Sequence, residues 1–596
     1  MLQLLADANP ELYAIFREGD SLEEVRDAVF AYVERAERAV FDPDNELHTL
    51  EKIVIRQCAG VMRSIAGRVN ELNTEFSALD CLWKLARDRR AELVTGVGPG
   101  FMMEFVHLFR GLAGRSLMYG PHPSRRHIPE FLKLEGRAAA HARTTTLDDM
   151  ASEVRKYFKK YPSGLEPEVI SWRRSNRNRL LGYFKGSLKD WANWKWHIRN
   201  VIKEPQPLLD LIELSEEQKQ AVRRAVKHHI PFGITPYYLS LMDRNSAIGF
   251  DHAVRAQVIP PPEYVDEMSR NLEQRAEVFD FMGEYDTSPQ DLVTRRYPMI
   301  GILKPFNTCA QICVYCQRNW EIEECLAPHA KASEKEIDRA LEWFAQHPGV
   351  GDVLVTGGDP LIMSDNDIDV LLGKIAALPQ VYRIRLGSRT PVVLPQRWTD
   401  ELVGIIAAYH QPGKREIAVV THFEHSYEVT PEARSAVDKI RKAGLSVFNQ
   451  QVYTIENCRR FETAKLRRDL KTIGVDPYYT FNMKGKEETR RYMVPIARIL
   501  QERKEEARLL PGLDRTGEPV FNVPKLGKNH LRAMQDHQVI MILPDGSRVY
   551  EFHPWEKYIM AVPTYTYVDR PILSFLEELA TRGEDILQYK TIWYYY

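Results

Sequence analysis

Cysteine is scarce in this chain of 596 residues, which contains only seven, an odd number. Four of them are scattered, so a secreted disulfide framework is excluded and we expect a reduced, cytoplasmic protein. No apolar run approaches the roughly 18 residues that a membrane-spanning helix needs, and the N-terminus lacks the basic and apolar segments of a secretion signal. Charge of either sign is not in excess, with 81 Lys and Arg against 82 Asp and Glu, so the composition favours neither nucleic acid nor a membrane as partner.

From about residue 299, short apolar runs alternate with amphipathic segments. The expected strands are residues 299–304, 352–357, 382–387, 417–423, 446–452 and 478–483, and the clearest helices between them are residues 334–346, 367–379, 399–410 and 430–444. Strands that alternate with helices predict a parallel sheet, because parallel neighbours need a crossover connection. Six units are too few for a closed eight-stranded barrel, so we predict an α/β fold with a partial (β/α)6 barrel.

Changes of pattern divide the rest of the chain. We predict a mostly helical N-terminal domain at 1–175, a helical segment leading into the barrel at 176–295, the barrel at 296–485 and a C-terminal segment with a hairpin at 486–596. A basic stretch with one tryptophan, 172–179, could bind nucleic acid, but a solvated linker is the simpler interpretation in a chain of balanced charge. No motif indicates the role of 1–175.

Polar signatures follow the expected strands at the points where they end. In parallel β/α folds the carboxyl ends of the strands meet at one face, where catalysis takes place. The signatures are the cysteine cluster, Gly357-Gly358-Asp359, Gly387-Ser388-Arg389, His422, Asn449-Gln450 and Lys484. We therefore predict that they form one site.

Three of the seven cysteines form the pattern Cys309-x3-Cys313-x2-Cys316 on the loop after the first strand. Thiolates suit zinc, copper(I) or an iron–sulfur cluster. Structural zinc needs four ligands, and Cys325 lies nine residues further on, outside the usual zinc spacing. Three thiolates on a 4Fe-4S cluster would leave one iron open for another molecule. The plain alternative is three buried cysteines without a metal.

The cysteine spacing resembles that of radical S-adenosylmethionine (radical SAM) enzymes. The resemblance implies that the open iron binds S-adenosylmethionine and that one electron from the cluster cleaves it to a 5′-deoxyadenosyl radical. Gly357, Gly358 and Asp359 resemble the family segment that binds the methionyl amine, where glycines allow a close backbone approach and Asp359 offers a carboxylate. The other residues expected to contact this cofactor are Ser388, Arg389, His422 and Gln450.

A longer resemblance, from about 186 to 555, is to the lysine 2,3-aminomutase family, and within it most closely to glutamate 2,3-aminomutase. The matching segments include THFEH, FNQQV and DPYYTFN. This family adds pyridoxal phosphate to the radical chemistry and moves an amino group from C2 to C3 of an amino acid. A lysine then has to hold the cofactor as a Schiff base. The resemblance places it at Lys528, after Gly527, with Lys525 as the alternative.

Further site residues follow from the same resemblance. Arg296 and Tyr297 match positions that line the cofactor pocket, where the planar arginine fork suits a phosphate. Arg318 matches the arginine that grips the substrate α-carboxylate. The two aspartates that hold the distal ammonium in lysine mutases correspond to Lys484 and Asn522, so an ammonium would be repelled and a carboxylate attracted. We therefore predict L-glutamate as substrate, unless Lys484 faces solvent.

Several expectations stay open on sequence alone. Cys458 resembles one zinc ligand of lysine mutases, but the C-terminal cysteines that complete that site are missing, so we expect no zinc. The family implies homo-oligomers and an electron donor such as flavodoxin or ferredoxin. Alternative functions are a 2,3-aminomutase acting on lysine, arginine or a protein-bound residue, a radical enzyme acting on nucleic acid, and a non-enzymatic cluster-binding protein.

Overall fold

A computed structural model describes residues 1–596 except 88–95, 120–128, 245–248, 484 and 534. The chain forms two compact units. Unit 1 consists of Met1–Val154, Val494–Leu509 and Asn529–Tyr596, and unit 2 consists of Arg155–Met493 and Leu510–Lys528. In the part of the chain that is described, no helix is long and apolar enough to cross a membrane. The four domain boundaries expected from the sequence stay a prediction.

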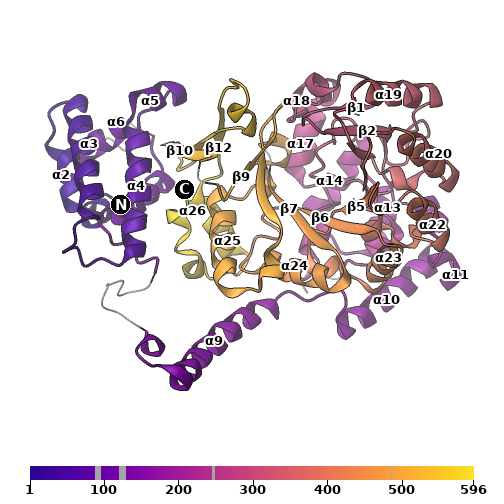
Figure 1. The fold of residues 1–596 in the computed structure, drawn as a ribbon, viewed down its shortest axis with the longest axis horizontal. Coiled ribbons are helices and arrows are strands. Elements are labelled where there is room, and N and C mark those ends of the chain that lie inside the picture. Colours follow the sequence, from indigo (N-terminus) through magenta and orange to yellow (C-terminus); the bar gives the residue numbers. More distant parts are fainter. Residues whose placement is uncertain (88–95, 120–128, 245–248, 484, 534) are drawn as a thin grey trace. The chain divides into compact units, whose positions relative to one another are not determined.

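Unit 2 contains the predicted barrel sheet, so the expected α/β fold class is confirmed (Figure 1). The strands that lie wholly in unit 2 follow one another in chain order: β1 (Val293–Thr294), β2 (Ile300–Phe306), β3 (Asp352–Gly357), β4 (Arg383–Gly387), β5 (Glu416–Thr421), β6 (Ser446–Tyr453), β7 (Asp476–Asn482) and β8 (Glu518–Asn522). All neighbours from β2 to β8 are parallel, while β1 runs antiparallel to β2. The sheet therefore extends by one parallel strand, β8, beyond the six expected.

Helices between the strands cover the outer face of this sheet (Figure 1). They are α19 (Glu334–Gln346), α20 (Asp365–Ala376), α22 (Asp400–Ala408), α23 (Pro431–Lys442) and α24 (Glu462–Ile473). The first of them matches its expected range, and α20 begins two residues early because the Ser364 side chain caps it by accepting from the Asp367 amide. Apolar side chains of strands and helices form one continuous buried core.

Along β4, side chains alternate between the helix-covered face of the sheet and its inner face. Ile384 and Leu386 are buried in the core under the helices, whereas Arg383 and Arg385 point the other way. Arg385 donates to Asp352 on β3 at 2.7 Å, and Arg383 donates to Glu416 on β5 at 2.7 Å. Charged pairs thus lie on the inner face of the sheet, near the points where β3, β4 and β5 begin.

The basic stretch 172–179 lies on α10 (Pro167–Tyr183), a helix of unit 2. Arg173 is buried, donates to the Tyr427 carbonyl at 2.6 Å and lies 4.1 Å from the centroid of the Tyr427 ring. Asn176 is also buried and donates to the carbonyls of Ser240 and Met242. These two side chains are used in packing against the barrel and its preceding segment, so they are not available to a nucleic acid.

Unit 1 joins the N-terminal helices to the C-terminal segment in a single core. The predicted hairpin is present as β10 (His537–Ile542) and β11 (Arg548–Phe552). Arg548 forms a buried ion pair of 2.9 Å with Glu104 of α8 (Pro99–Leu112), and it also donates to the carbonyls of Trp593 and Tyr595. The His107 ring stacks on Trp593. Residues at the two ends of the sequence therefore depend on each other for burial.

Candidate active site

The three cysteines lie on the loop between β2 and α19, at the carboxyl end of β2. This loop folds back on itself, because the Thr308 hydroxyl donates to the Glu324 carbonyl at 2.7 Å and the Cys325 thiol donates to the Cys309 carbonyl at 3.2 Å. Burial raises the pKa of Cys309 well above its usual range, and Asp359 and the other two cysteines raise it further by charge repulsion. Three mutually repelling thiolates fit an iron–sulfur cluster, whose irons would compensate their charge.

Cys325 differs from these three cysteines although it shares their loop. It is fully buried, and burial raises the pKa of its thiol to about 12. Its sulfur packs against Gly233, where a Cβ atom would collide with it. Cys325 therefore has a packing role, and its absence from the ligand set stays a prediction.

Gly357 and Gly358 bring the end of β3 against the start of the cysteine loop. Gly357 has φ +117°, and the Gly358 and Asp359 amides donate to the carbonyls of Phe306 and Thr308, each at 2.8 Å. A Cβ atom on Gly358 would collide with the Thr308 backbone. The glycines are required by this close approach, one residue before Cys309.

A Gly358→Ala variant should therefore hold less of the iron–sulfur cluster than the wild type. The added methyl group overlaps backbone atoms of the loop, so the loop has to shift, at a cost of about 1–3 kcal/mol. We expect iron per chain after anaerobic reconstitution to fall to less than about half of the wild-type value. Gly404→Ala is the matched control, since a Cβ atom there meets nothing within 4 Å. Equal iron contents in the two variants would contradict the expectation.

Asp359 links the ends of β3 and β4. Its buried carboxylate accepts from the Ser388 hydroxyl at 3.0 Å and from the amides of Arg389 and Leu361 at 2.8 and 3.1 Å. Burial raises the pKa of Asp359, and these hydrogen bonds oppose the rise. In this arrangement the carboxylate fixes the segment that carries Ser388 and Arg389, and its contact with a methionyl amine stays a prediction.

Arg389 connects the cysteine loop to polar groups that lie outside the strands of the sheet. One guanidinium nitrogen lies 2.7 Å from Cys313 Sγ, and the others donate to Glu428 at 2.9 Å, to Gln257 and to the His422 carbonyl at 3.2 Å. A cation held beside a cluster sulfur stabilises negative charge there. The sequence indicated Arg389 and His422, whereas Glu428 and Gln257 carry no motif and emerge only from the fold.

Lys528 and Lys525 have different surroundings. The Lys528 Nζ donates to the Tyr297 hydroxyl at 2.6 Å and lies 5.1 Å from the centroid of the Tyr479 ring, inside the barrel. Burial, followed by the charges of Arg296 and Arg385, lowers the pKa of Lys528 to about 7. Lys525 is exposed and forms an ion pair with Asp286. Lys528 is half-buried, and a lysine with a lowered pKa is the type that forms Schiff bases.

The rate at which Lys528 reacts with pyridoxal phosphate should rise between pH 6 and pH 8. With a pKa of about 7, roughly a tenth of the amine is neutral at pH 6 and roughly nine-tenths at pH 8. Stopped-flow absorbance of imine formation measures this profile. Arg385→Gln should move it to higher pH, because one of the repelling charges is removed. A wild-type profile centred near pH 10 would contradict the expectation.

Arg296 and Arg318 meet at a carboxylate that the sequence did not indicate. Glu284 Oε1 lies 2.7 Å from an Arg318 nitrogen and 3.5 Å from one of Arg296. The Arg318 amide donates to Cys316 Sγ at 3.3 Å, and Arg296 precedes Tyr297, the partner of Lys528. Contacts therefore run from the cysteine loop through Arg318 and Glu284 to Arg296, whose neighbour Tyr297 contacts Lys528. The residues predicted separately for the cluster and for the second cofactor thus belong to one region.

The remaining predicted residues lie on neighbouring strands or outside the described residues. Gln450 is half-buried on β6, and Asn522 is buried at the end of β8. Lys484 lies outside the described residues. Lys486, two positions on, is buried and pairs with Glu488 at 2.7 Å.

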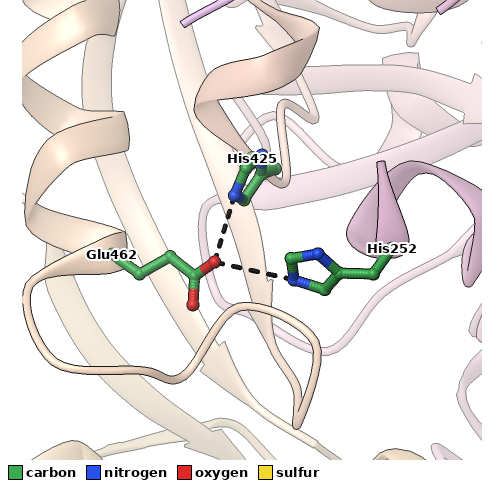
Figure 2. Close-up of side chains that lie close together, drawn as sticks. All are labelled: His252, His425 and Glu462. Atoms are coloured by element: carbon green, nitrogen blue, oxygen red, sulfur yellow. Dashed lines mark hydrogen bonds and ion pairs between the residues drawn. The ribbon is translucent and has the colours of Figure 1, made fainter. Parts of the chain in front are cut away.

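His252, His425 and Glu462 form a group whose residue types could hold a metal ion (Figure 2). Both imidazoles face the same carboxylate oxygen, at 3.8 and 3.0 Å. Arg459 also donates to this oxygen at 2.7 Å, and the Tyr427 amide donates to His425 Nδ1, which leaves the other ring nitrogen as a donor. Burial raises the pKa of Glu462, but Arg459 and His425 outweigh it and lower the pKa overall. Arg459 and the His425 N–H thus satisfy the carboxylate without a metal.

The parallel barrel and its three-cysteine loop define a radical SAM enzyme, and residues 303–463 match the radical SAM superfamily. Membership implies a 4Fe-4S cluster and S-adenosylmethionine. The chain is 43% identical to an uncharacterized KamA family protein of Methanocaldococcus jannaschii over 98% of this chain and 96% of that protein. It therefore belongs to the KamA family, which confirms the resemblance read from the motifs.

Two relatives have named activities. Glutamate 2,3-aminomutase of Clostridioides difficile is 32% identical over 56% of this chain and 74% of its own length. L-lysine 2,3-aminomutase of Fusobacterium nucleatum is 35% identical over 49% of this chain and 65% of its own length. With such relatives the chain is an enzyme of the isomerase class. The two mutase alignments leave more than two-fifths of the chain uncovered, whereas the archaeal relative extends over nearly all of it.

Proposed function

We propose that this protein is a 2,3-aminomutase that moves the amino group of L-glutamate from C2 to C3 and gives β-glutamate. The observation that carries the proposal is Lys528, a half-buried lysine with a lowered pKa whose amine lies 2.6 Å from the Tyr297 hydroxyl, in the barrel that carries the cysteine loop. Pyridoxal phosphate, when bound to this lysine, would supply the electron sink through which an amino group can migrate.

The residues present fit that cofactor. The neutral amine of Lys528 can attack its aldehyde, and Tyr297 orients the amine through their hydrogen bond. Arg296 offers a planar guanidinium to the phosphate. The aromatic rings of Tyr297 and Tyr479 lie 4.5 and 5.1 Å from the lysine nitrogen and keep the pocket partly apolar, which excludes water from reactive species.

The choice of glutamate rests on residue type. Overall identity does not discriminate, because the glutamate and lysine mutases match at 32% and 35%. At the positions that hold a lysine ammonium in lysine mutases, this chain has Lys484 and Asn522. Asn522 is buried at the end of β8, where its amide can donate to a carboxylate, and a lysine at 484 would add attraction for the same group. Arg318 would hold the α-carboxylate at the other end of the substrate.

Anaerobic incubation with glutamate, lysine and arginine in separate reactions tests the proposal. The reduced enzyme with both cofactors should convert glutamate to β-glutamate, detected by mass spectrometry, and leave lysine and arginine unchanged. β-Lysine as the main product would overturn the choice of substrate, and no product from any free amino acid would favour a protein-bound substrate. We also propose a one-electron donor such as flavodoxin or ferredoxin, a homo-oligomeric assembly and a cytoplasmic location.

A further inference from the structure

Glu284 is a buried carboxylate between two buried arginines. The exposed fractions of the three side chains are 1% for Glu284, 7% for Arg296 and 9% for Arg318. One oxygen, Oε1, serves both guanidinium groups, at 3.5 and 2.7 Å. Arginine side chains are long and flexible, so a shared acceptor fixes the position of each relative to the other.

The ion pairs continue beyond Glu284. Arg318 also lies 3.3 Å from Glu321, and Glu321 pairs with Lys304 of β2 at 2.8 Å. Three cations and two carboxylates therefore alternate from Arg296 to Lys304, with one positive charge in excess. The excess positive charge of this row attracts an anionic ligand, and within the row each cation has carboxylates as its neighbours.

The segment that carries Glu284 is attached to the loop that precedes Lys528. The Lys525 amide donates to the Met282 carbonyl at 2.9 Å, and its side chain pairs with Asp286. Gly283 has φ +60°, and a Cβ atom there would meet the Lys525 side chain. Residues 282–286 thus contact the lysine loop on one side and, through Glu284, both arginines on the other.

We infer that Glu284 is a positioning residue that sets the distance between the phosphate site at Arg296 and the α-carboxylate site at Arg318. This inference rests on the proposed function. Moving an amino group between adjacent carbons requires the cofactor and the substrate carboxylate to be held in one fixed relation, since small displacements of reacting groups lower rates strongly. Glu284 holds Arg296 and Arg318 at a fixed distance from each other and itself contacts neither the cofactor nor the substrate.

The test compares Glu284→Gln and Glu284→Asp with wild type in the cluster-loaded enzyme. Glutamine keeps the length but removes the charge, and aspartate keeps the charge but is too short to reach both arginines. We expect both variants to raise the dissociation constant of pyridoxal phosphate, measured by absorbance titration, and the KM for glutamate by about tenfold or more. They should also lower kcat by about tenfold or more, because the reacting groups are displaced from each other. Iron content should stay at the wild-type value.

Glu321→Gln is the matched control, because Glu321 contacts Arg318 but not Arg296. It should raise KM and leave the affinity for pyridoxal phosphate unchanged.

Two results would overturn the inference. If Glu284 only masks charge, the Glu284→Asp variant would behave as wild type and the Glu284→Gln variant would bind anions more tightly. Unchanged constants in both variants would also contradict a positioning role. If wild type binds pyridoxal phosphate but does not convert glutamate, the substrate proposal fails while the cofactor affinities still decide the role of Glu284. If wild type binds no pyridoxal phosphate, both fail.

Discussion

Replacing Cys313 with serine should abolish cluster assembly and the cleavage of S-adenosylmethionine. The hydroxyl is a poor ligand for iron, and two thiolates do not hold a four-iron cluster. We expect iron per chain after reconstitution to fall below roughly a tenth of the wild-type value, and 5′-deoxyadenosine formed after reduction to fall by a factor of roughly 10³ or more. Cys309→Ser and Cys316→Ser should give the same result.

Cys325→Ser is the control for this experiment. Serine has nearly the same shape as cysteine and can still donate to the Cys309 carbonyl, so the loop should keep its fold and its iron. If Cys325→Ser lost iron to the same extent as Cys313→Ser, the ligand set would have to be changed. Retained cleavage of S-adenosylmethionine in Cys313→Ser would contradict the assignment of Cys313.

Lys528→Ala should remove the Schiff base with pyridoxal phosphate and nearly all turnover. The amine that donates to the Tyr297 hydroxyl belongs to Lys528, and the variant removes it. We expect a loss of about 10³-fold or more in kcat, as is typical when a covalent catalyst is removed, together with loss of the imine absorbance. Iron content and 5′-deoxyadenosine formation without substrate should be unchanged, because the cysteine loop is untouched.

Lys525→Gln is the matched variant for Lys528→Ala. Its ammonium is exposed and its pairing with Asp286 is a surface interaction, worth about 0–1 kcal/mol. Activity should stay within about twofold of wild type. The opposite pattern, an active Lys528→Ala and an inactive Lys525→Gln, would transfer the Schiff base to Lys525.

The N-terminal residues pack with C-terminal residues in unit 1, and no sequence motif indicated this. Glu104 and Arg548 are 444 positions apart and form an ion pair that is shielded from water. Pairing at such a separation depends on the whole chain being folded, so no local pattern reports it. The alignment with the relative from Methanocaldococcus jannaschii covers 98% of this chain, so it includes the residues that form unit 1.

The barrel was predictable because its pattern is local. The range 334–346 was predicted from its amphipathic pattern, and α19 has the same bounds. The structure adds that the Ser333 side chain caps this helix. The ends of β3 and β4 could be expected to meet because parallel strands place their carboxyl ends on one face, and the Asp359–Ser388 hydrogen bond joins them there. β8 was missed because a long helical connection, α25 (Ile496–Leu509), separates it from β7.

The sequence by itself determined the cysteine loop, the order of the strands and the family, because these depend on spacing and residue type along the chain. Only the tertiary structure decided that Lys528 is enclosed while Lys525 is exposed, and that Glu284 stands between Arg296 and Arg318. The physical reason is that burial and charge–charge interactions act through space. Their strength at one residue depends on groups brought to it from distant parts of the chain, as Arg296 and Arg385 are brought to Lys528.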